Sequence, residues 1–323
     1  MKDFCIVGSG ISGSTIANLL YKKSTVEIFD KARGPGGRSS NRRYVSNLNF
    51  DHGLQYLNPK SKEFKKFILI LKKKKILIEW LGTHLDFTFE KKEKLIKYIG
   101  KRGNNDICKY LIKNIKTNYN STVTNIKFNS NHWIITLKDS KKIFFKNLIL
   151  TCPFPQTKLL VTNYIKKKIS DLKVNMTPNI TVMVAYKNSK KIPINSIKFN
   201  DDIIAWVAQE NTKNRFKSSK ILWTIQCTES YSKKIINSLK KNKNKYELII
   251  LRRFESLMGF KVKNILFKNI HGWRYSYNKI STSQKSIFID KINLGICGDW
   301  FIGPKAENAW HSAMNLFNKI KIK

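Results

Sequence analysis

The chain is poor in acidic residues and cysteines, and it has no long apolar run. Its 323 residues contain 62 Lys+Arg against 21 Asp+Glu, which gives a formal net charge of +41 at pH 7. The five cysteines form no CxxC pair and no His-x-His spacing occurs, so the sequence predicts neither a disulfide framework nor a zinc site. No apolar run approaches the ~18 residues that a membrane-spanning helix needs. We therefore expect reduced thiols, no membrane span and a cytoplasmic location.

The excess of positive charge is weak support for a nucleic-acid partner. Of the 62 basic residues 53 are Lys and 9 are Arg, and the lysines are spread along the whole chain. Recognition of phosphates and bases favours the forked guanidinium of Arg. We therefore expect no nucleic-acid partner, although a basic binding protein stays open as an alternative.

The N-terminus reads as a strand, a glycine loop, a helix and a second strand. The apolar run 4–7 predicts a buried parallel strand, and it leads directly into a GxGxxG motif at 8–13, which argues against a signal peptide. Apolar residues then recur at helical spacing, and a second strand at 25–29 ends at Asp30. This order predicts a dinucleotide-binding unit.

Each conspicuous residue of this unit has a physical role there. Gly8 makes the tight turn, Gly10 lets a pyrophosphate approach the backbone, and Gly13 lets the helix pack on the strand. The pyrophosphate is expected at the N-terminus of the helix. Asp30 is placed to accept hydrogen bonds from a ribose hydroxyl, and its charge argues against a 2′-phosphate at this site.

Two further segments extend the cofactor site. Residues 31–39 contain Gly36-Gly37-Arg38, in which the glycines allow a tight fold over the pyrophosphate and Arg38 adds a cation. A nicotinamide-type unit has no need of that segment. Near the C-terminus, the run 294–300 predicts a strand that ends in Gly298-Asp299, and a helix with an apolar stripe follows.

These stretches resemble the flavin-containing amine oxidase superfamily and, within it, the bacterial renalase-type FAD-dependent oxidoreductases. The resemblance is carried by DKARGPGGR at 30–38, DHGLQY at 51–56, GDW at 298–300 and NAW at 308–310, with local matches at 98–103 and 271–275. It implies an α/β fold, with a Rossmann-like FAD-binding domain and an inserted α+β substrate domain of the amine-oxidase type. The implied FAD-binding domain comprises 1–57, 117–153 and 291–323, and the substrate domain 58–116 and 154–290.

The resemblance also implies which residues contact the cofactor FAD and the substrate. For FAD, the motifs and the resemblance together give Gly8, Gly10, Ile11, Gly13, Asp30, Lys31, Arg38, Leu54, Gln55, Val123, Asp299, Ala306 and Ala309. For the substrate they give Tyr56, Leu57, Asn58, Gly100, Lys101, Trp273, Tyr275 and Trp300. Three apolar runs separated by the polar segments 129–131 and 138–142 predict a β-meander over 122–150. The resemblance assigns this meander to the FAD-binding domain, and Val123 is equally compatible with a place in the core.

The resemblance to renalase-type proteins implies that the activity is oxidation of dihydronicotinamide isomers, the 2- or 6-dihydro forms of NAD(P), to NAD(P)+. The sequence offers no Ser-His-Asp or paired-carboxylate arrangement and no metal site, which fits hydride transfer to flavin N5 with no catalytic side chain. O2 is the expected acceptor and gives H2O2. An amine oxidase, a carotenoid-type desaturase or a flavin-binding protein without turnover are the alternatives.

Overall fold

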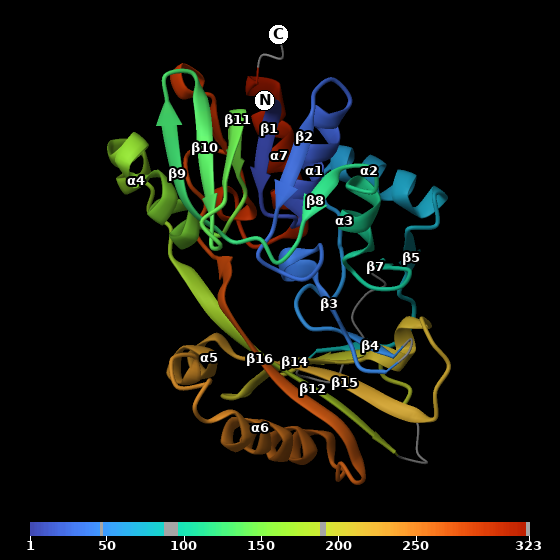
Figure 1. Cartoon of the computed structure of the whole chain (residues 1–323). Helices are drawn as coiled ribbons and strands as arrows, with labels where there is room; N and C mark the ends of the chain where they lie inside the picture. The colour runs from blue at the N-terminus through green and yellow to red at the C-terminus, as the bar shows by residue number, and fades with distance from the viewer. Residues whose placement is uncertain (46–47, 87–95, 188–191, 321–323) are drawn as a thin grey trace.

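Two sheets, each assembled from segments far apart in the chain, organise the molecule (Figure 1). The computed structural model describes residues 1–45, 48–86, 96–187 and 192–320. The first sheet lies in the upper part of Figure 1 and the second in the lower part, and the long strands β12 and β16 run between them. The N-terminus and the C-terminal end of the described residues, at Ile320, both lie at the upper sheet.

Within the described residues the first sheet has eight strands, in the order β17-β18-β11-β1-β2-β8 with β10 and β9 attached to β11. The contacts among β18, β11, β1, β2 and β8 are parallel, whereas β9, β10 and β11 form the antiparallel meander that the sequence predicts. Its strands are β1 (Lys2–Val7), β2 (Val26–Phe29), β8 (Lys116–Asn118), β9 (Val123–Asn129), β10 (His132–Leu137), β11 (Lys142–Leu150), β17 (Ile287–Ile289) and β18 (Leu294–Ile296).

The second sheet has six strands in the described part of the chain, in the order β16-β12-β15-β14-β13-β6, and it is antiparallel except where β13 meets β6. Its strands are β6 (His84–Leu85), β12 (Met176–Lys187), β13 (Ser196–Lys198), β14 (Ile204–Gln209), β15 (Lys220–Cys227) and β16 (Ile265–Asn278). Two small ribbons lie between the sheets: β3 (Asn41–Arg43) with β4 (Asn49–Asp51), and β5 (Leu77–Glu79) with β7 (Tyr98–Gly100).

The helices cover both sheets. They are α1 (Ile11–Tyr21), α2 (Lys62–Lys73), α3 (Asp106–Leu111), α4 (Phe154–Ser170), α5 (Glu229–Ile235), α6 (Lys243–Met258) and α7 (Ala306–Lys319), with short turns η1 (Gly37–Ser39), η2 (Glu210–Lys213), η3 (Asp290–Ile292) and η4 (Asp299–Phe301). The N-terminus of α2 shows why a helix starts there, because the Ser61 hydroxyl accepts from the Phe64 amide at 3.2 Å and Glu63 lies in the first turn.

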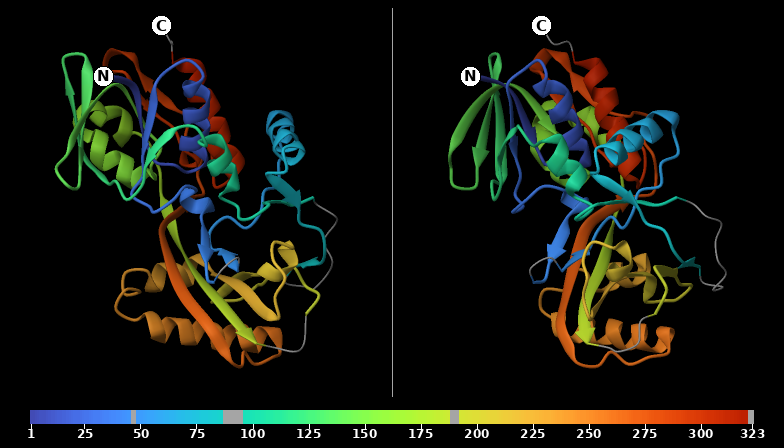
Figure 2. Two further views of the ribbon diagram at one scale, coloured as in Figure 1. Left: turned by 45° about the vertical axis from the view of Figure 1, so that its right-hand side comes forward. Right: turned by 90° about the vertical axis from the view of Figure 1, so that its right-hand side faces the viewer.

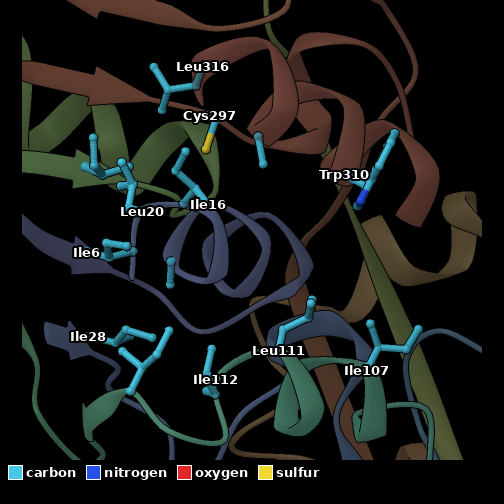
Figure 3. Packing of buried hydrophobic residues seen from close by; sticks show 14 of the residues in the cluster. Ile6, Ile16, Leu20, Ile28, Ile107, Leu111, Ile112, Cys297, Trp310 and Leu316 are labelled. Carbon is cyan, nitrogen blue, oxygen red and sulfur yellow. The ribbon is translucent and has the colours of Figure 1, made fainter. Parts of the chain in front are cut away.

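Side chains that point alternately to the two faces of the first sheet contribute to two separate apolar cores. Phe4 and Ile6 of β1 face α1, α7, α2 and α3, as Figure 3 shows for Ile6 among the side chains of α1, α3 and α7. Cys5 and Val7 face α4 and the meander. Successive side chains of a strand point to opposite faces, so a parallel sheet covered on both faces needs an unbroken apolar run.

The packing bears on the expected domain division, which stays a prediction. The chain passes repeatedly between the lobes, as interleaved domains require (Figure 2). Helices α2, α3 and α4 all belong to the predicted substrate domain, but they pack with the first sheet. Helices α2 and α3 share one apolar core with α1 and α7, and α4 packs on the opposite face of this sheet. Helices α5 and α6 cover the second sheet's far face.

Candidate functional site

The glycine loop between β1 and α1 has the geometry of an anion site. Gly8 has a φ of +107°, and a Cβ on Gly13 would lie 2.0 Å from the Gly8 carbonyl oxygen, so neither position accepts a side chain without strain. A Cβ on Gly10 would meet nothing closer than 3.9 Å, which leaves room beside the loop. Helix α1 starts without a side-chain cap and without an acidic residue in its first turn. Its unpaired first amides therefore fit a pyrophosphate.

Asp30, at the end of β2, is held against this loop. Its carboxylate accepts from the Ser9 amide at 2.7 Å and from the Ser9 hydroxyl at 2.5 Å, and the other oxygen accepts from the Ala32 amide at 2.8 Å. The predicted acid is thus fixed beside the glycine loop. Of its predicted neighbours, Ile11 begins α1 and packs against the core, whereas Lys31 is exposed.

The arginine of the double-glycine segment meets the C-terminal aspartate. The Gly36 amide donates to the Ser9 carbonyl at 3.0 Å, which places the double glycine over the glycine loop. Arg38 then forms a bidentate pair with Asp299 at 2.8 and 2.5 Å and donates to the Ser276 carbonyl at 2.6 Å. Two predicted cofactor segments, 261 positions apart, therefore converge on one place.

The segment 51–55 lies between Arg38 and the second sheet. The Leu54 amide donates to the Arg38 carbonyl at 2.8 Å, and a Cβ on Gly53 would lie 2.0 Å from the same oxygen. From the other side the Trp273 indole donates to the His52 carbonyl at 2.8 Å. The predicted cofactor residue Leu54 and the predicted substrate residue Trp273 thus hold the two sides of one segment.

Next in the chain, Tyr56 and Leu57 enter an aromatic cluster. The Tyr56 ring lies 6.3 Å from Trp80 and 6.5 Å from Trp206, measured between centroids, and burial raises the pKa of the Tyr56 phenol. Leu57 is buried and pairs with Tyr98 in a β-bridge. This bridge brings the predicted substrate segments 56–58 and 100–101 side by side.

The remaining predicted substrate residues are placed less uniformly. Gly100 is buried and donates its amide to Asn104 Oδ1 at 2.9 Å, while the neighbouring Lys101 is exposed. Asn58 and Tyr275 are half-buried. Their predicted roles stay predictions.

Trp300 lies in the core of the first sheet. It has no exposed surface, and its ring lies 3.8 Å from Phe301 and 5.1 Å from Phe154 between centroids. The indole donates to the Cys152 carbonyl at 3.1 Å. The structure therefore does not place Trp300 with the other predicted substrate residues, because its packing and its one donor are already used within the core.

The other predicted cofactor positions are Val123, Ala306 and Ala309. Val123 begins β9 and is half-buried against the second core. Ala306 begins α7 and Ala309 is buried. The first turn of α7 carries Glu307, whose carboxylate accepts from the Ser61 amide at 2.7 Å. Glu307 therefore adds a negative charge at the positive N-terminal end of α7.

Sequence reasoning missed a buried charge network that joins these segments. Lys213 has no exposed side-chain surface, and its Nζ donates to Asp51 at 2.8 Å and Gln55 at 3.2 Å and lies 2.8 Å from Glu210. Arg215, also buried, donates to the same oxygen of Asp51. No sequence signal distinguishes these two cations among 62 basic residues.

The network shifts the pKa values of its two acids, Asp51 and Glu210, in opposite directions. Burial by itself raises the pKa of Asp51, but Arg215 and Lys213 hold it well below its ordinary value. Burial raises the pKa of Glu210, and its neighbours Lys213 and Arg215 only partly oppose that effect. Asp51 is therefore the charged partner of the two cations.

Two neutral histidines lie next to this segment. His52 stacks on Trp273 with 5.0 Å between ring centroids and meets His271 edge-on at 4.9 Å. Burial lowers the pKa of His52 to about 3 and that of His271 to about 4. Nδ1 of His52 is buried and has no hydrogen-bond partner. Both imidazoles are therefore uncharged at pH 7.

Within the described ranges, no group of three or more His, Cys, Asp and Glu side chains could hold a metal ion. Among the same residues, no helix has the length and apolar character needed to cross a membrane.

Comparisons with known proteins bear on the fold. A family model described as an NAD(P)-binding Rossmann-like domain matches residues 6–69. The whole chain is similar to the structure of a protein assigned as a protoporphyrinogen oxidase from Exiguobacterium sp. 255-15, with a TM-score of 0.75, 10% identity and 98% of each chain covered.

It is also similar to putrescine oxidase. An engineered triple mutant gives a TM-score of 0.73 at 8% identity with 98% of each chain covered. The wild-type enzyme bound to putrescine gives 0.68 at 9% identity, with 98% of this chain and 97% of that chain covered. The predicted fold is thus confirmed: a Rossmann-like domain of the FAD-binding type carries an antiparallel sheet domain, as in amine-oxidase-type proteins.

Proposed function

We propose that the protein is an FAD-dependent oxidoreductase that oxidises dihydronicotinamide isomers to NAD(P)+. The observation that carries the flavin assignment is the convergence of Arg38, Asp299, the segment 51–55 and Trp273 beside a glycine loop. A nicotinamide-type unit would need the glycine loop alone. The amine-oxidase-type fold of the whole chain supports the same choice.

The residues present fit FAD. The uncapped start of α1 and the open side of Gly10 suit its pyrophosphate, and Asp30 suits the adenosine ribose. Arg38 and Asp299 offer a cation and an acceptor at the other end of the loop. Bound there, FAD supplies a two-electron acceptor that O2 can reoxidise to give H2O2.

The protein's own side chains then bind and orient the substrate. The neutral imidazoles of His52 and His271 add no charge beside Trp273, so an aromatic cation such as NAD(P)+ is not repelled there. A dihydronicotinamide becomes NAD(P)+ by losing a hydride from its ring, which requires no proton acceptor. The uncharged state of His52 and His271 beside Trp273 agrees with a reaction that needs no proton acceptor.

The cations of the aromatic cluster favour an anionic substrate over an amine. Nζ of Lys97 lies 5.1 Å from the centroid of the Tyr56 ring, and that of Lys213 lies 5.2 Å from the centroid of the Trp80 ring. Amine oxidation with an aromatic cage needs free ring faces, because the substrate cation itself lies on the rings. The phosphates of a dinucleotide instead gain from the charge of Lys97, whereas Lys213 is buried and already paired with Asp51 and Glu210.

The test is an anaerobic titration of the yellow holoprotein with 2- and 6-dihydro-NAD(P). We expect the flavin band to bleach at about one equivalent, and the colour and peroxide to return in air. Reduction by putrescine or a porphyrinogen, with none by the dihydronicotinamides, would refute the substrate. A colourless protein that binds no added FAD would refute the cofactor.

A charge variant tests the substrate class independently. Lys97→Gln is expected to raise the KM for the dinucleotide about tenfold and to leave kcat unchanged. Lys187→Gln, an exposed lysine at the far end of β12, is the matched control. An equal effect of both changes would contradict a local role for Lys97.

A further inference from the structure

We propose that the outer face of α2 is a docking surface for an anionic lipid bilayer. The helix lies at the edge of the first sheet's lobe, away from the second sheet, and its outer side is free of other elements in both views of Figure 2. The proposal concerns where the protein works and is independent of its substrate.

The two faces of α2 differ in a way that burial explains. Phe64, Ile68 and Leu71 are buried and pack with α1 and α7 in the first core. This stripe accounts for the attachment of the helix to the protein. Leu69 and Ile70 are not part of it, because they keep 55% and 54% of their surface exposed.

The exposed aliphatic pair lies among lysines. At about 100° per residue, Leu69 projects opposite Leu71 together with Lys62, Lys66 and Lys73. Ile70 projects about 100° from Leu71, on a flank that also carries the exposed Glu63. Lys65 and Lys75 are also exposed along the helix and just after it. Exposure of two aliphatic side chains to water is unfavourable, whereas a bilayer interface can take up both the aliphatic side chains and the lysines around them.

Neighbouring segments extend the positive charge. The Lys101 amide donates to the Ile76 carbonyl at 2.9 Å, which places the exposed loop at Lys101 and Arg102 beside the end of α2. The nearby acid Asp106 is buried and forms ion pairs with Arg102 and Lys109. The surface therefore offers clustered cations to the phosphates of lipid head groups.

A bilayer fits this surface better than a nucleic acid does. Phosphate backbones attract lysines equally well, but they provide no apolar region for Leu69 and Ile70. A bilayer supplies both components, because the aliphatic side chains can enter the boundary between head groups and acyl chains while the lysines stay at the phosphates. The exposed aliphatic side chains of Leu69 and Ile70, rather than the positive charge, therefore favour a bilayer as the partner of this surface.

The test is cosedimentation of the holoprotein with phosphatidylcholine vesicles that contain, or lack, phosphatidylserine, at about 0.15 M salt. We expect binding only to the anionic vesicles. Replacing Lys65, Lys66, Lys73 and Lys75 with Gln should weaken binding about 100-fold or more, and Leu69→Asn with Ile70→Asn should weaken it about tenfold. All these side chains are exposed, so the variants are expected to fold, which circular dichroism verifies.

A charge-matched control separates this surface from net charge. Replacing Lys127, Lys138, Lys141 and Lys142 of the meander with Gln removes the same charge elsewhere, and Leu159→Asn removes an exposed aliphatic side chain of α4. These controls should bind vesicles as the parent protein does. Equal losses in both lysine sets would overturn the proposal. DNA binding that needs the α2 lysines but not Leu69 and Ile70, without vesicle binding, would also overturn it.

Discussion

Replacement of Lys213 by methionine tests the buried charge network directly. Methionine keeps a similar length and packs well in a core, but it removes the cation that lies 2.8 Å from both Asp51 and Glu210. Asp51 is then left with Arg215 as its cation, and Gln55 loses the ammonium that donates to its Oε1.

The expected cost follows from burial. None of these side chains has more than 1% of its surface exposed, apart from Gln55, which is also buried, so water cannot replace the lost ammonium. Removing one partner of such a buried network costs about 3–5 kcal/mol of unfolding free energy. At ~2 °C per kcal/mol for a chain of this size, the melting temperature should fall by about 6–10 °C.

The assay is urea and thermal unfolding of the parent and the variant, with and without added FAD. Lys217→Met, an exposed lysine four positions later, should change the unfolding free energy by less than about 0.5 kcal/mol. Adding Glu210→Gln to Lys213→Met should recover part of the loss, because the amide keeps an acceptor for Thr224 without a charge. A loss below about 1 kcal/mol in Lys213→Met would refute the assignment of the network as a stabilising unit.

Further predictions concern pH and the cofactor cradle. Because His52 and His271 have pKa values of about 3 and about 4 in the folded state and near 6.5 when unfolded, the unfolded chain binds more protons below pH 6.5. The unfolding free energy should therefore fall as pH drops from 6.5 towards 4, by about 2 kcal/mol per histidine at pH 5, and replacing both with Gln should flatten this slope in urea titrations. Gly13→Ala should abolish FAD retention during gel filtration, whereas Gly34→Ala, where a Cβ meets nothing within 4 Å, should retain it. Arg38→Met should weaken FAD binding about tenfold or more in fluorescence titrations, and unchanged affinity would remove Arg38 from the cradle.

Local patterns in the sequence were sufficient for the first half of the site. The glycine loop, the two strands around it and Asp30 lie within 30 residues, and their conformations depend on glycine's freedom and on apolar periodicity. The meander 123–150 was equally readable, because turn residues separate its alternating strands. These features are encoded in neighbouring residues, so no tertiary contact was needed to predict them.

Only the tertiary structure decided which distant residues meet. Arg38 pairs with Asp299 because the strands before them end at the same edge of one sheet, and Lys213 reaches Asp51 because the second sheet packs over the segment 51–55. The packing of α4 on the first sheet buried Trp300 against Phe154 and Phe301. In a lysine-rich chain the sequence does not distinguish a solvated lysine from a buried one, because the environment of the side chain is set by elements far away in the sequence. The sequence therefore determined the cofactor loop, and the packing of the two sheets determined the charges around it.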